Sequence, residues 1–454
     1  MDHNPRSDLR SLLRSGLSKS LVSLVIKVAT AGLTYGMYVI LARLMGVTEY
    51  GYFAFGLSLA TILAIGANYG QQTAILRYWP EEMVAGRPQK ALDALRSGGA
   101  VTIIAGLGIS VLLLGVGAVS DGFGVPGGHL YAAATLILPL ALAEYWSSAL
   151  RAQGSVWTAL TPRDIVWRLG LPVLVVALWY AGVTLSGAAA LLLTATVLGL
   201  SLALQYVLAR ARRYEIAPGT GGLGSYWREH GTPSRSFFLG TVLDSAALNV
   251  DIIFVGLLVA PAAAGVYFNA FRTAGLLTLF MFAITLVVAP MVARHYHAGE
   301  MRKAQAITAL CAWAGFLFSL VVFFGFLLFG DVILGLFGEG QEQGKTILIL
   351  LSIGLLFDAA TGPSRIVLMM TGHERQYVRI FGSIVVAGML AQLVVIPIYG
   401  LMGAAIMNMI ARIAAQLAIA SFAHRKIGLD TTLLGAFLVN RLADSPPPRT
   451  VPAP

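Results

Sequence analysis

The chain has 454 residues, of which 57% are hydrophobic and only 11% charged, and its mean hydropathy is +0.79. A soluble globular domain carries about 25% charged residues, so this composition excludes an ordinary soluble protein and indicates a membrane protein. The formal net charge of +10 does not indicate nucleic-acid binding, because the basic residues lie in short loops between apolar runs, and the single cysteine excludes an intrachain disulfide.

Twelve apolar segments are long enough, at about 20 residues each, to cross a bilayer as helices. In chain order they are residues 21–44, 52–75, 100–119, 131–150, 156–180, 188–208, 237–259, 266–288, 306–329, 347–370, 380–398 and 401–423. Pro162, Asp164, Arg168 and Pro172 interrupt the fifth segment, and neighbouring helices or water would have to satisfy the freed carbonyls. The sequence therefore predicts an all-α, polytopic membrane protein.

A polar stretch at residues 210–235 divides the chain into halves of similar length. We interpret it as a cytoplasmic connector between an N-terminal six-helix lobe at 1–209 and a C-terminal six-helix lobe at 236–427. Residues 428–454 form a predicted cytoplasmic tail. Its amphipathic piece at 433–442 is expected on the inner membrane surface, and its Pro-rich end is expected to be disordered.

The positions of the basic residues predict the orientation. Most Lys and Arg residues fall in alternate loops, including Arg210 to Arg235, whereas the opposite loops hold only Lys345, with Arg43 at a helix end. Basic residues are retained on the cytoplasmic side, so both termini are predicted to be cytoplasmic and the number of spans to be even.

Three short patterns recur between the two halves. Glu-Tyr-Gly-Tyr-Phe at 49–53 resembles Gly-Val-Tyr-Phe at 265–268, Arg-Tyr-Trp at 77–79 resembles Arg-His-Tyr at 294–296, and Gly154 corresponds to Gly372. The separations are nearly equal, and six helices per half would make the two halves a parallel repeat.

Two of these regions resemble a known family. Leu-Ala-Arg-Leu-Met-Gly-Val-Thr-Glu-Tyr-Gly-Tyr-Phe at 41–53 is similar to the first-loop pattern of bacterial polysaccharide (Wzx-type) flippases. These flippases share a superfamily with multidrug/toxin extruders and lipid II flippases. Residues 251–272, from Asp-Ile-Ile-Phe-Val-Gly to Asn-Ala-Phe-Arg, resemble the corresponding part of the second half. Twelve spans, rather than about fourteen, favour the polysaccharide branch over lipid II flippases.

The resemblance implies two six-helix lobes around a central cavity. It also implies export of an undecaprenyl-pyrophosphate-linked oligosaccharide across the bacterial inner membrane, alongside the polysaccharide assembly machinery, with H+ or Na+ as candidate coupling ions. No cofactor is implied.

Ionisable side chains inside predicted spans are costly and are therefore candidate functional residues. They are Lys27, Glu144, Asp244, Asp251, Arg272, Asp358, Arg365 and Arg412. Asp251 and Arg272 lie about two turns from one end of consecutive antiparallel helices, which predicts a structural ion pair. Glu144 and Asp358 occupy nearly equivalent places before Gly154 and Gly372, so they are predicted to bind a coupling ion. A hydrogen bond to a neighbouring helix is the alternative role.

Lys27, Arg365 and Arg412 are predicted to bind the anionic head of the substrate, because arginine grips a phosphate with two donors and lysine acts as a point charge. Neighbouring carboxylates or backbone carbonyls are the alternative partners. Asn68, Gln71 and Gln72 could bind sugar hydroxyls, although such amides more often link helices to one another.

Other motifs in the sequence do not indicate a nucleotide or metal site. Gly-Thr-Gly-Gly-Leu-Gly at 219–224 matches a dinucleotide fingerprint but lacks the βαβ context, and no Walker A sequence exists. His295 and His297 lack further metal ligands. The sequence thus predicts no catalytic or metal site. Two rival functions stay open: an ion-coupled extruder of amphipathic cations and a membrane-embedded polysaccharide polymerase or ligase, which would need a large outer loop.

Overall fold

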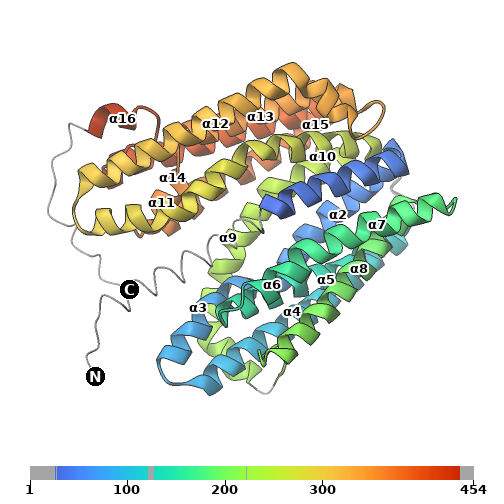
Figure 1. Cartoon of the computed structure of the whole chain (residues 1–454), viewed down its shortest axis with the longest axis horizontal. Coiled ribbons are helices and arrows are strands. Elements are labelled where there is room, and N and C mark those ends of the chain that lie inside the picture. Colours follow the sequence, from blue (N-terminus) through green and yellow to red (C-terminus); the bar gives the residue numbers. More distant parts are fainter. Residues whose placement is uncertain (1–25, 27, 121–126, 221, 440–454) are drawn as a thin grey trace. The chain divides into compact units, whose positions relative to one another are not determined.

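The computed structural model describes residue 26 and residues 28–120, 127–220 and 222–439 (Figure 1). All secondary structure in these residues is helical, as the sequence predicts. Among them, nine helices are long and apolar enough to cross a membrane. The twelve predicted spans differ from these nine helices for two reasons. The fifth and eighth predicted spans are broken into shorter helices, and the last two predicted spans merge into one helix. The chain is a multi-pass membrane protein.

The chain forms two compact units, Met1–Gly265 and Val266–Pro454. The boundary lies beyond the predicted connector because α9 (Leu223–Leu258) packs against α2 (Val47–Asn68) of the first unit. Roughly half of that connector is helical, since α9 begins at Leu223, well before the predicted seventh span. The polar first turns of α9 fold as a helix because Tyr226 packs inside the core of unit 1.

Helix α5 (Gly127–Ala152) lies at the centre of unit 1, where it packs against α2, α4 (Pro88–Val119) and α8 (Gly187–Ala211). Alanine and serine line much of its buried surface, and small side chains let helix backbones approach closely in a membrane. The Tyr145 hydroxyl donates to the Leu95 carbonyl at 2.5 Å and fixes α5 against α4.

Two of the predicted spans in unit 1 are interrupted. The second divides into α2 and α3 (Gln71–Val84) at Tyr69 and Gly70, both of which have left-handed backbone angles. The fifth divides into α6 (Trp157–Leu160), the π-helical turn η2 (Thr161–Val166) and α7 (Trp167–Tyr180). Pro162 lies in η2 and lacks an N–H group for regular α-helical bonding.

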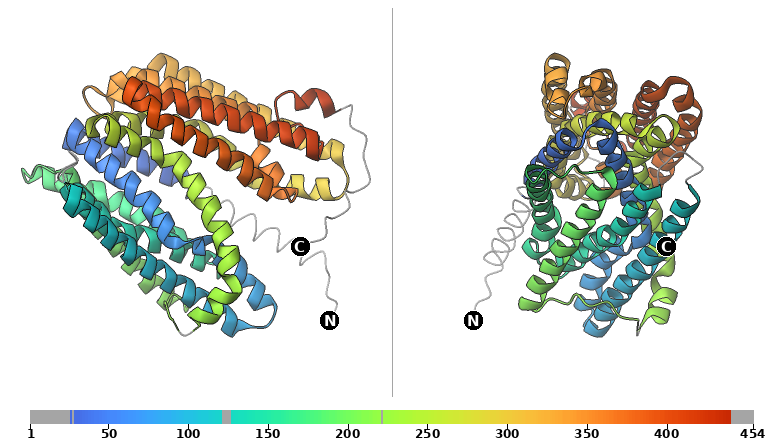
Figure 2. Two further views of the ribbon diagram at one scale, coloured as in Figure 1. Left: turned by 180° about the vertical axis from the view of Figure 1, so that it is seen from behind. Right: turned by 90° about the vertical axis from the view of Figure 1, so that its right-hand side faces the viewer.

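Unit 2 is a bundle of long helices, coloured yellow to red in Figure 2. They are α11 (Leu279–His297), α12 (Met301–Gly335), α13 (Lys345–Ala360), α14 (Ser364–Met370) and α15 (Glu374–Phe422). The eighth predicted span is divided into three elements: α10 (Pro261–Ala274), the 3-10 turn η3 (Gly275–Thr278) and α11. Helix α10 begins before the boundary between the two units. The last two predicted spans join in α15, where Gly400 has the non-helical angles φ 59° and ψ −139°.

The tenth predicted span is broken between α13 and α14. Gly362 adopts φ +64° there, and Pro363 cannot donate a backbone hydrogen bond. Residues after α15 continue through the π-helical turn η5 (Ala423–Ile427) to the short helix α16 (Gly435–Leu438), which packs on α12 (Figure 1). The predicted amphipathic piece at 433–442 is therefore only partly helical among the described residues, and its last residues lie outside them.

Gly187 provides a test of the packing in unit 1. A methyl group there would lie 2.5 Å from the Glu49 carbonyl oxygen and 2.8 Å from Tyr52 Cβ. Gly187→Ala is expected to lower the free energy of unfolding by about 1–3 kcal/mol, the usual cost of overpacking. Gly199→Ala in the same helix meets open space and is expected to be neutral or to stabilise by up to about 1 kcal/mol. Thermal unfolding of the purified protein checks both, and equal stability of the two variants would contradict the packing.

Candidate functional site

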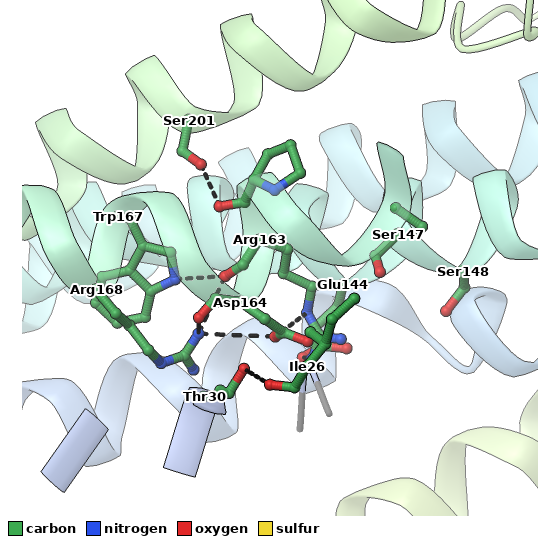
Figure 3. A network of polar contacts seen from close by, with 12 residues as sticks. Ile26, Thr30, Glu144, Ser147, Ser148, Arg163, Asp164, Trp167, Arg168 and Ser201 are labelled. Atoms are coloured by element: carbon green, nitrogen blue, oxygen red, sulfur yellow. Dashed lines mark hydrogen bonds and ion pairs between the residues drawn. The ribbon is translucent and has the colours of Figure 1, made fainter. Parts of the chain in front are cut away.

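A cluster of charged side chains lies inside unit 1, where the interrupted fifth span meets α5 (Figure 3). Glu144 from α5 forms an ion pair and hydrogen bond with Arg163 from η2. Asp164 forms ion pairs with two arginines: Arg163 Nε lies 3.8 Å and Arg168 Nη1 3.7 Å from its Oδ1 atom. The Asp164 side chain is only 2% exposed, so a carboxylate is held between two guanidinium groups away from water. With Arg151, these residues are the unit 1 arginine cluster.

The π-helical turn positions this cluster. A π-turn leaves carbonyl groups without their usual helical donors, and such turns are frequent at functional sites. Here Arg168 Nη1 donates to the carbonyls of Arg163 and Asp164 at 3.1 and 3.0 Å, and the Trp167 indole donates to Arg163 at 2.5 Å. The Ser201 hydroxyl of α8 donates to the carbonyl of Pro162. Side chains therefore satisfy the carbonyls that the turn releases.

Arginine outnumbers carboxylate in the unit 1 arginine cluster. Arg151 belongs to α5, one turn beyond Ser148, to whose hydroxyl it donates at 2.9 Å. Arg151, Arg163 and Arg168 face Glu144 and Asp164, so the cluster carries one excess positive charge. Arg168 Nε is buried and has no hydrogen-bond acceptor among the residues that the structure describes. A buried guanidinium donor without an acceptor is costly, and an anion could satisfy it.

A second cluster lies inside unit 2, between α13 and α15. Arg412 Nη1 is 3.7 Å from Asp358 Oδ2, and the Gln416 amide donates to Asp358 Oδ1. The Ser364 hydroxyl donates to Gln416 Oε1 at 3.2 Å, which brings the start of α14 into the same network. Arg365 follows Ser364, and its guanidinium lies 5.2 Å from the centre of the Tyr377 ring. Asp358, Ser364, Arg365, Arg412 and Gln416 form the unit 2 arginine cluster.

This second cluster has the same excess of positive charge, because two arginines accompany one carboxylate. Arg412 Nε is also buried, and no acceptor for it lies in the described part of the chain. Gly354 lets α15 approach α13 closely, since a methyl group there would lie 3.3 Å from Met409 Cα. Among the described residues, each unit thus holds one arginine whose buried Nε–H group has no acceptor.

The structure brings together some of the predicted site residues and separates others. Glu144 and Asp358, predicted to bind a coupling ion, each contact an arginine; that role stays a prediction. Arg365 and Arg412 share the unit 2 arginine cluster as described above. Lys27 lies outside the described residues.

The amides near the end of α2 behave differently from one another. Asn68 is fully buried, donates to Ala64 and Ala141 carbonyls at 3.2 and 3.1 Å, and accepts from Thr102. Through these bonds Asn68 links helices to one another, which is the alternative to sugar binding in the sequence analysis. Gln72 Oε1 is buried without a partner, which leaves its predicted contact with sugar hydroxyls untested.

Asp251 and Arg272 belong to different units. Asp251 is buried in unit 1, and the guanidinium of Arg272 lies 4.8 Å from the centre of the Phe268 ring in unit 2. Their ion pair stays a prediction. In the part of the chain that the structure describes, no group of three His, Cys, Asp or Glu side chains could hold a metal ion.

Sequence reasoning missed Arg163 as a site residue and treated Asp164 and Arg168 only as interruptions of a span. The signal was present, because prolines and opposite charges inside an apolar segment are the pattern of a broken helix that lines a polar site. What the sequence did not show was the contact with Glu144, since a π-turn shifts the facing side chains by one residue.

Comparison with known proteins decides the family. Residues 17–296, more than half of the chain, match the family described as Polysaccharide biosynthesis protein. The chain belongs to this polysaccharide biosynthesis protein family. Residues 237–398 also match the MatE family. A search of curated proteins finds no significant sequence match.

Solved structures share the fold of this polysaccharide biosynthesis protein. An inward-facing multidrug resistance MATE family transporter of the MOP superfamily matches with TM-score 0.70 and 17% identity, over 90% of this chain and 98% of its own. Lipid II flippase MurJ, in an inward closed conformation, matches with TM-score 0.67 and 14% identity, over 94% of each chain. A MOP superfamily transporter from Pyrococcus furiosus, reported to have a binding pocket of reverse polarity, matches with TM-score 0.63 and 15% identity. The match covers 90% of this chain and 95% of that transporter.

Identities this low establish the fold alone. That fold is all-helical with two lobes, as the sequence predicts for this chain. Membership of the polysaccharide biosynthesis protein family rests on the sequence match alone.

Proposed function

We propose that this protein is a flippase that moves an undecaprenyl-pyrophosphate-linked oligosaccharide from the inner to the outer leaflet of the bacterial inner membrane. It works by alternating access in surface polysaccharide biosynthesis, next to the polysaccharide assembly machinery, and both termini face the cytoplasm. The family match supports a substrate in polysaccharide biosynthesis. The positions of the basic residues support the orientation.

The observation that carries the proposal is the excess of arginine in both buried clusters. Each cluster keeps one guanidinium Nε–H group, on Arg168 or Arg412, for which the described residues provide no acceptor. Phosphate oxygens accept two parallel bonds from a guanidinium, so a pyrophosphate head matches these donors in charge and geometry. An amphipathic cation would instead be repelled.

Glu144 and Asp358 have a role in this proposal as exchangeable partners. Arg163 is held by Glu144 and Arg412 by Asp358. A pyrophosphate that binds an arginine displaces the carboxylate, which is then free to bind H+ or Na+. Substrate entry and ion binding would be coupled through competition for the same guanidinium groups.

Energetics favour a protein route for the head. Each sugar hydroxyl that enters hydrocarbon without a partner costs about 2–7 kcal/mol, so several hydroxyls make unassisted flipping very slow. The apolar tail can stay in lipid. If the pyrophosphate carries two negative charges across the whole field, the membrane potential favours outward movement by about 4–5 kcal/mol per 100 mV. This could drive export without an ion gradient.

A second function has support from the MatE match at residues 237–398. An ion-coupled extruder of cations needs a carboxylate that is free to meet its substrate. In the two arginine clusters, by contrast, each carboxylate lies within 4 Å of an arginine.

Deletion of the gene separates the two functions. We expect lipid-linked oligosaccharide to accumulate on the inner leaflet, where externally added glycosidase cannot reach it in intact spheroplasts, and surface polysaccharide to be lost. Normal surface polysaccharide together with increased sensitivity to cationic drugs would contradict the flippase and support the extruder.

A further inference from the structure

The chain after α15 folds back on unit 2 and is tied to it at several points. Gly428 has φ +79° and reverses the chain after η5. Gln305 of α12 is fully buried, and its amide nitrogen donates to the Asp430 and Gly435 carbonyls at 2.6 and 3.2 Å. Its amide oxygen accepts from the Asp430 N–H at 2.8 Å. One side chain thus bonds to two points, Asp430 and Gly435, of the segment 428–438, which we name the C-terminal strap.

The C-terminal strap fills the break between α13 and α14. The Leu433 N–H donates to the Ala360 carbonyl at 3.1 Å, which is a carbonyl that the broken helix leaves unpaired. Gly362 comes so close that a methyl group there would lie 2.3 Å from the Thr431 carbonyl oxygen. The Trp313 indole donates to the Leu433 carbonyl at 3.1 Å. The strap therefore determines the geometry of this break.

The break lies inside the unit 2 arginine cluster. Gly362 and Pro363 form the break. Asp358 lies four residues before Gly362, and Ser364 and Arg365 come directly after Pro363. Since Ser364 bonds to Gln416, and Gln416 to Asp358, a shift of the strap would change the geometry around Arg412.

The side chains on the outer surface of the strap are apolar, whereas its backbone is hydrogen-bonded to unit 2. Leu434 is 67% exposed and Phe437 is 73% exposed. The turn that leads into the strap carries exposed Arg425 and Lys426. Apolar side chains beside basic residues are the composition of a segment that lies in an anionic membrane surface.

We propose that residues 424–438 are an anchor for anionic lipid heads, and that Gln305 couples this anchor to the unit 2 arginine cluster. Arg425 and Lys426 bind the lipid phosphates while Leu434 and Phe437 enter the interface. Binding holds the break between α13 and α14 in the geometry described here. Gln305 is a positioning residue. The inference rests on the proposed function for its effect on transport, but the lipid contact is independent of it.

The lipid contact is tested on the full chain in nanodiscs. Cys311 is the single cysteine and is buried, so Cys311→Ala with Phe437→Cys gives one exposed thiol for an environment-sensitive fluorophore. We expect shallow spin-labelled lipids to quench the fluorophore in discs that contain phosphatidylglycerol. In pure phosphatidylcholine discs quenching should be much weaker. A fluorophore that stays in water in both kinds of disc would overturn the proposal.

Charge variants show whether the basic turn is responsible. Arg425→Gln with Lys426→Gln is expected to lower the equilibrium constant for insertion roughly thirtyfold, since each basic residue near an anionic surface contributes about a fivefold factor. Arg375→Gln with Arg379→Gln removes the same charge from the exposed start of α15 and is the matched control. Equal loss in both pairs would mean general attraction to the membrane and would overturn the site.

Transport shows whether Gln305 couples the anchor to the cluster. We expect wild-type flipping of lipid-linked oligosaccharide in vesicles to increase with the phosphatidylglycerol fraction. Gln305→Leu should keep fluorophore insertion and lose this dependence, whereas a merely structural role would lower flipping equally in all lipids and overturn the coupling. Absence of flipping by the wild type would contradict the proposed function and leave the insertion result intact.

Discussion

Replacing Arg163 by glutamine is expected to lower the free energy of unfolding by about 3–5 kcal/mol, because it removes one counter-charge of the buried Asp164 and the ion-pair partner of the partly buried Glu144. Glu144 would lose its ion pair, and Asp164, at 2% exposure, would lose the guanidinium of Arg163 while that of Arg168 stays 3.7 Å away. The measurement is the yield of monodisperse protein from membranes together with its thermal unfolding. The double variant Arg163→Gln with Glu144→Gln should recover part of the loss, since one stranded charge is then removed.

Arg212→Gln is the matched control for this experiment. Arg212 is exposed after the end of α8, in the same unit, and its side chain forms no ion pair among the described residues. We expect a change of less than about 0.5 kcal/mol, as is usual for surface substitutions. If Arg163→Gln behaves like Arg212→Gln, the unit 1 arginine cluster does not stabilise the fold.

Arg412→Gln is expected to reduce export about 10–100-fold, the range that corresponds to one charge-assisted hydrogen-bonding contact. It should also destabilise unit 2, because Asp358 then lacks its cation. Adding Asp358→Asn removes the stranded charge, so stability should recover in part while export stays low. This separation distinguishes substrate binding from folding, since a structural arginine would recover both.

Arg412→Lys refines this result. Lysine keeps the charge but lacks the planar fork of donors, so we expect intermediate export at near-normal stability. Full export by the double variant of Asp358 and Arg412, at normal abundance, would show that Arg412 does not contact the pyrophosphate.

Much of the fold follows from the sequence because a bilayer imposes one strong condition: each span must be apolar and helical. The ends of α5 and α8 lie within a few residues of the predicted spans for that reason. The breaks at Gly70 and Gly362 were not predicted. Glycine permits a left-handed angle but does not require one, and close approach by Ser234 and Thr431 decides it there.

The candidate site was only partly predictable. Asp358, Arg365 and Arg412 stand out in the sequence because ionisable side chains are rare in apolar segments. The partner of each carboxylate depends on the rotation of neighbouring helices, which periodicity does not determine. For Glu144, the partner Arg163 also depends on a π-turn. Gln416, which bonds Asp358, carries no sequence signal that separates it from any other polar residue in a span.

Reconstitution tests the flippase directly. The purified protein is placed in vesicles that contain fluorescent undecaprenyl-pyrophosphate-linked oligosaccharide, and a membrane-impermeant reductant reports how much label lies outside. The account predicts that wild-type vesicles make nearly all label accessible over time and that the Arg412→Gln, Asp358→Asn double variant leaves the inner fraction protected. It also predicts faster movement of label toward the positive side of a membrane potential. Equal protection in wild-type, variant and protein-free vesicles would contradict it.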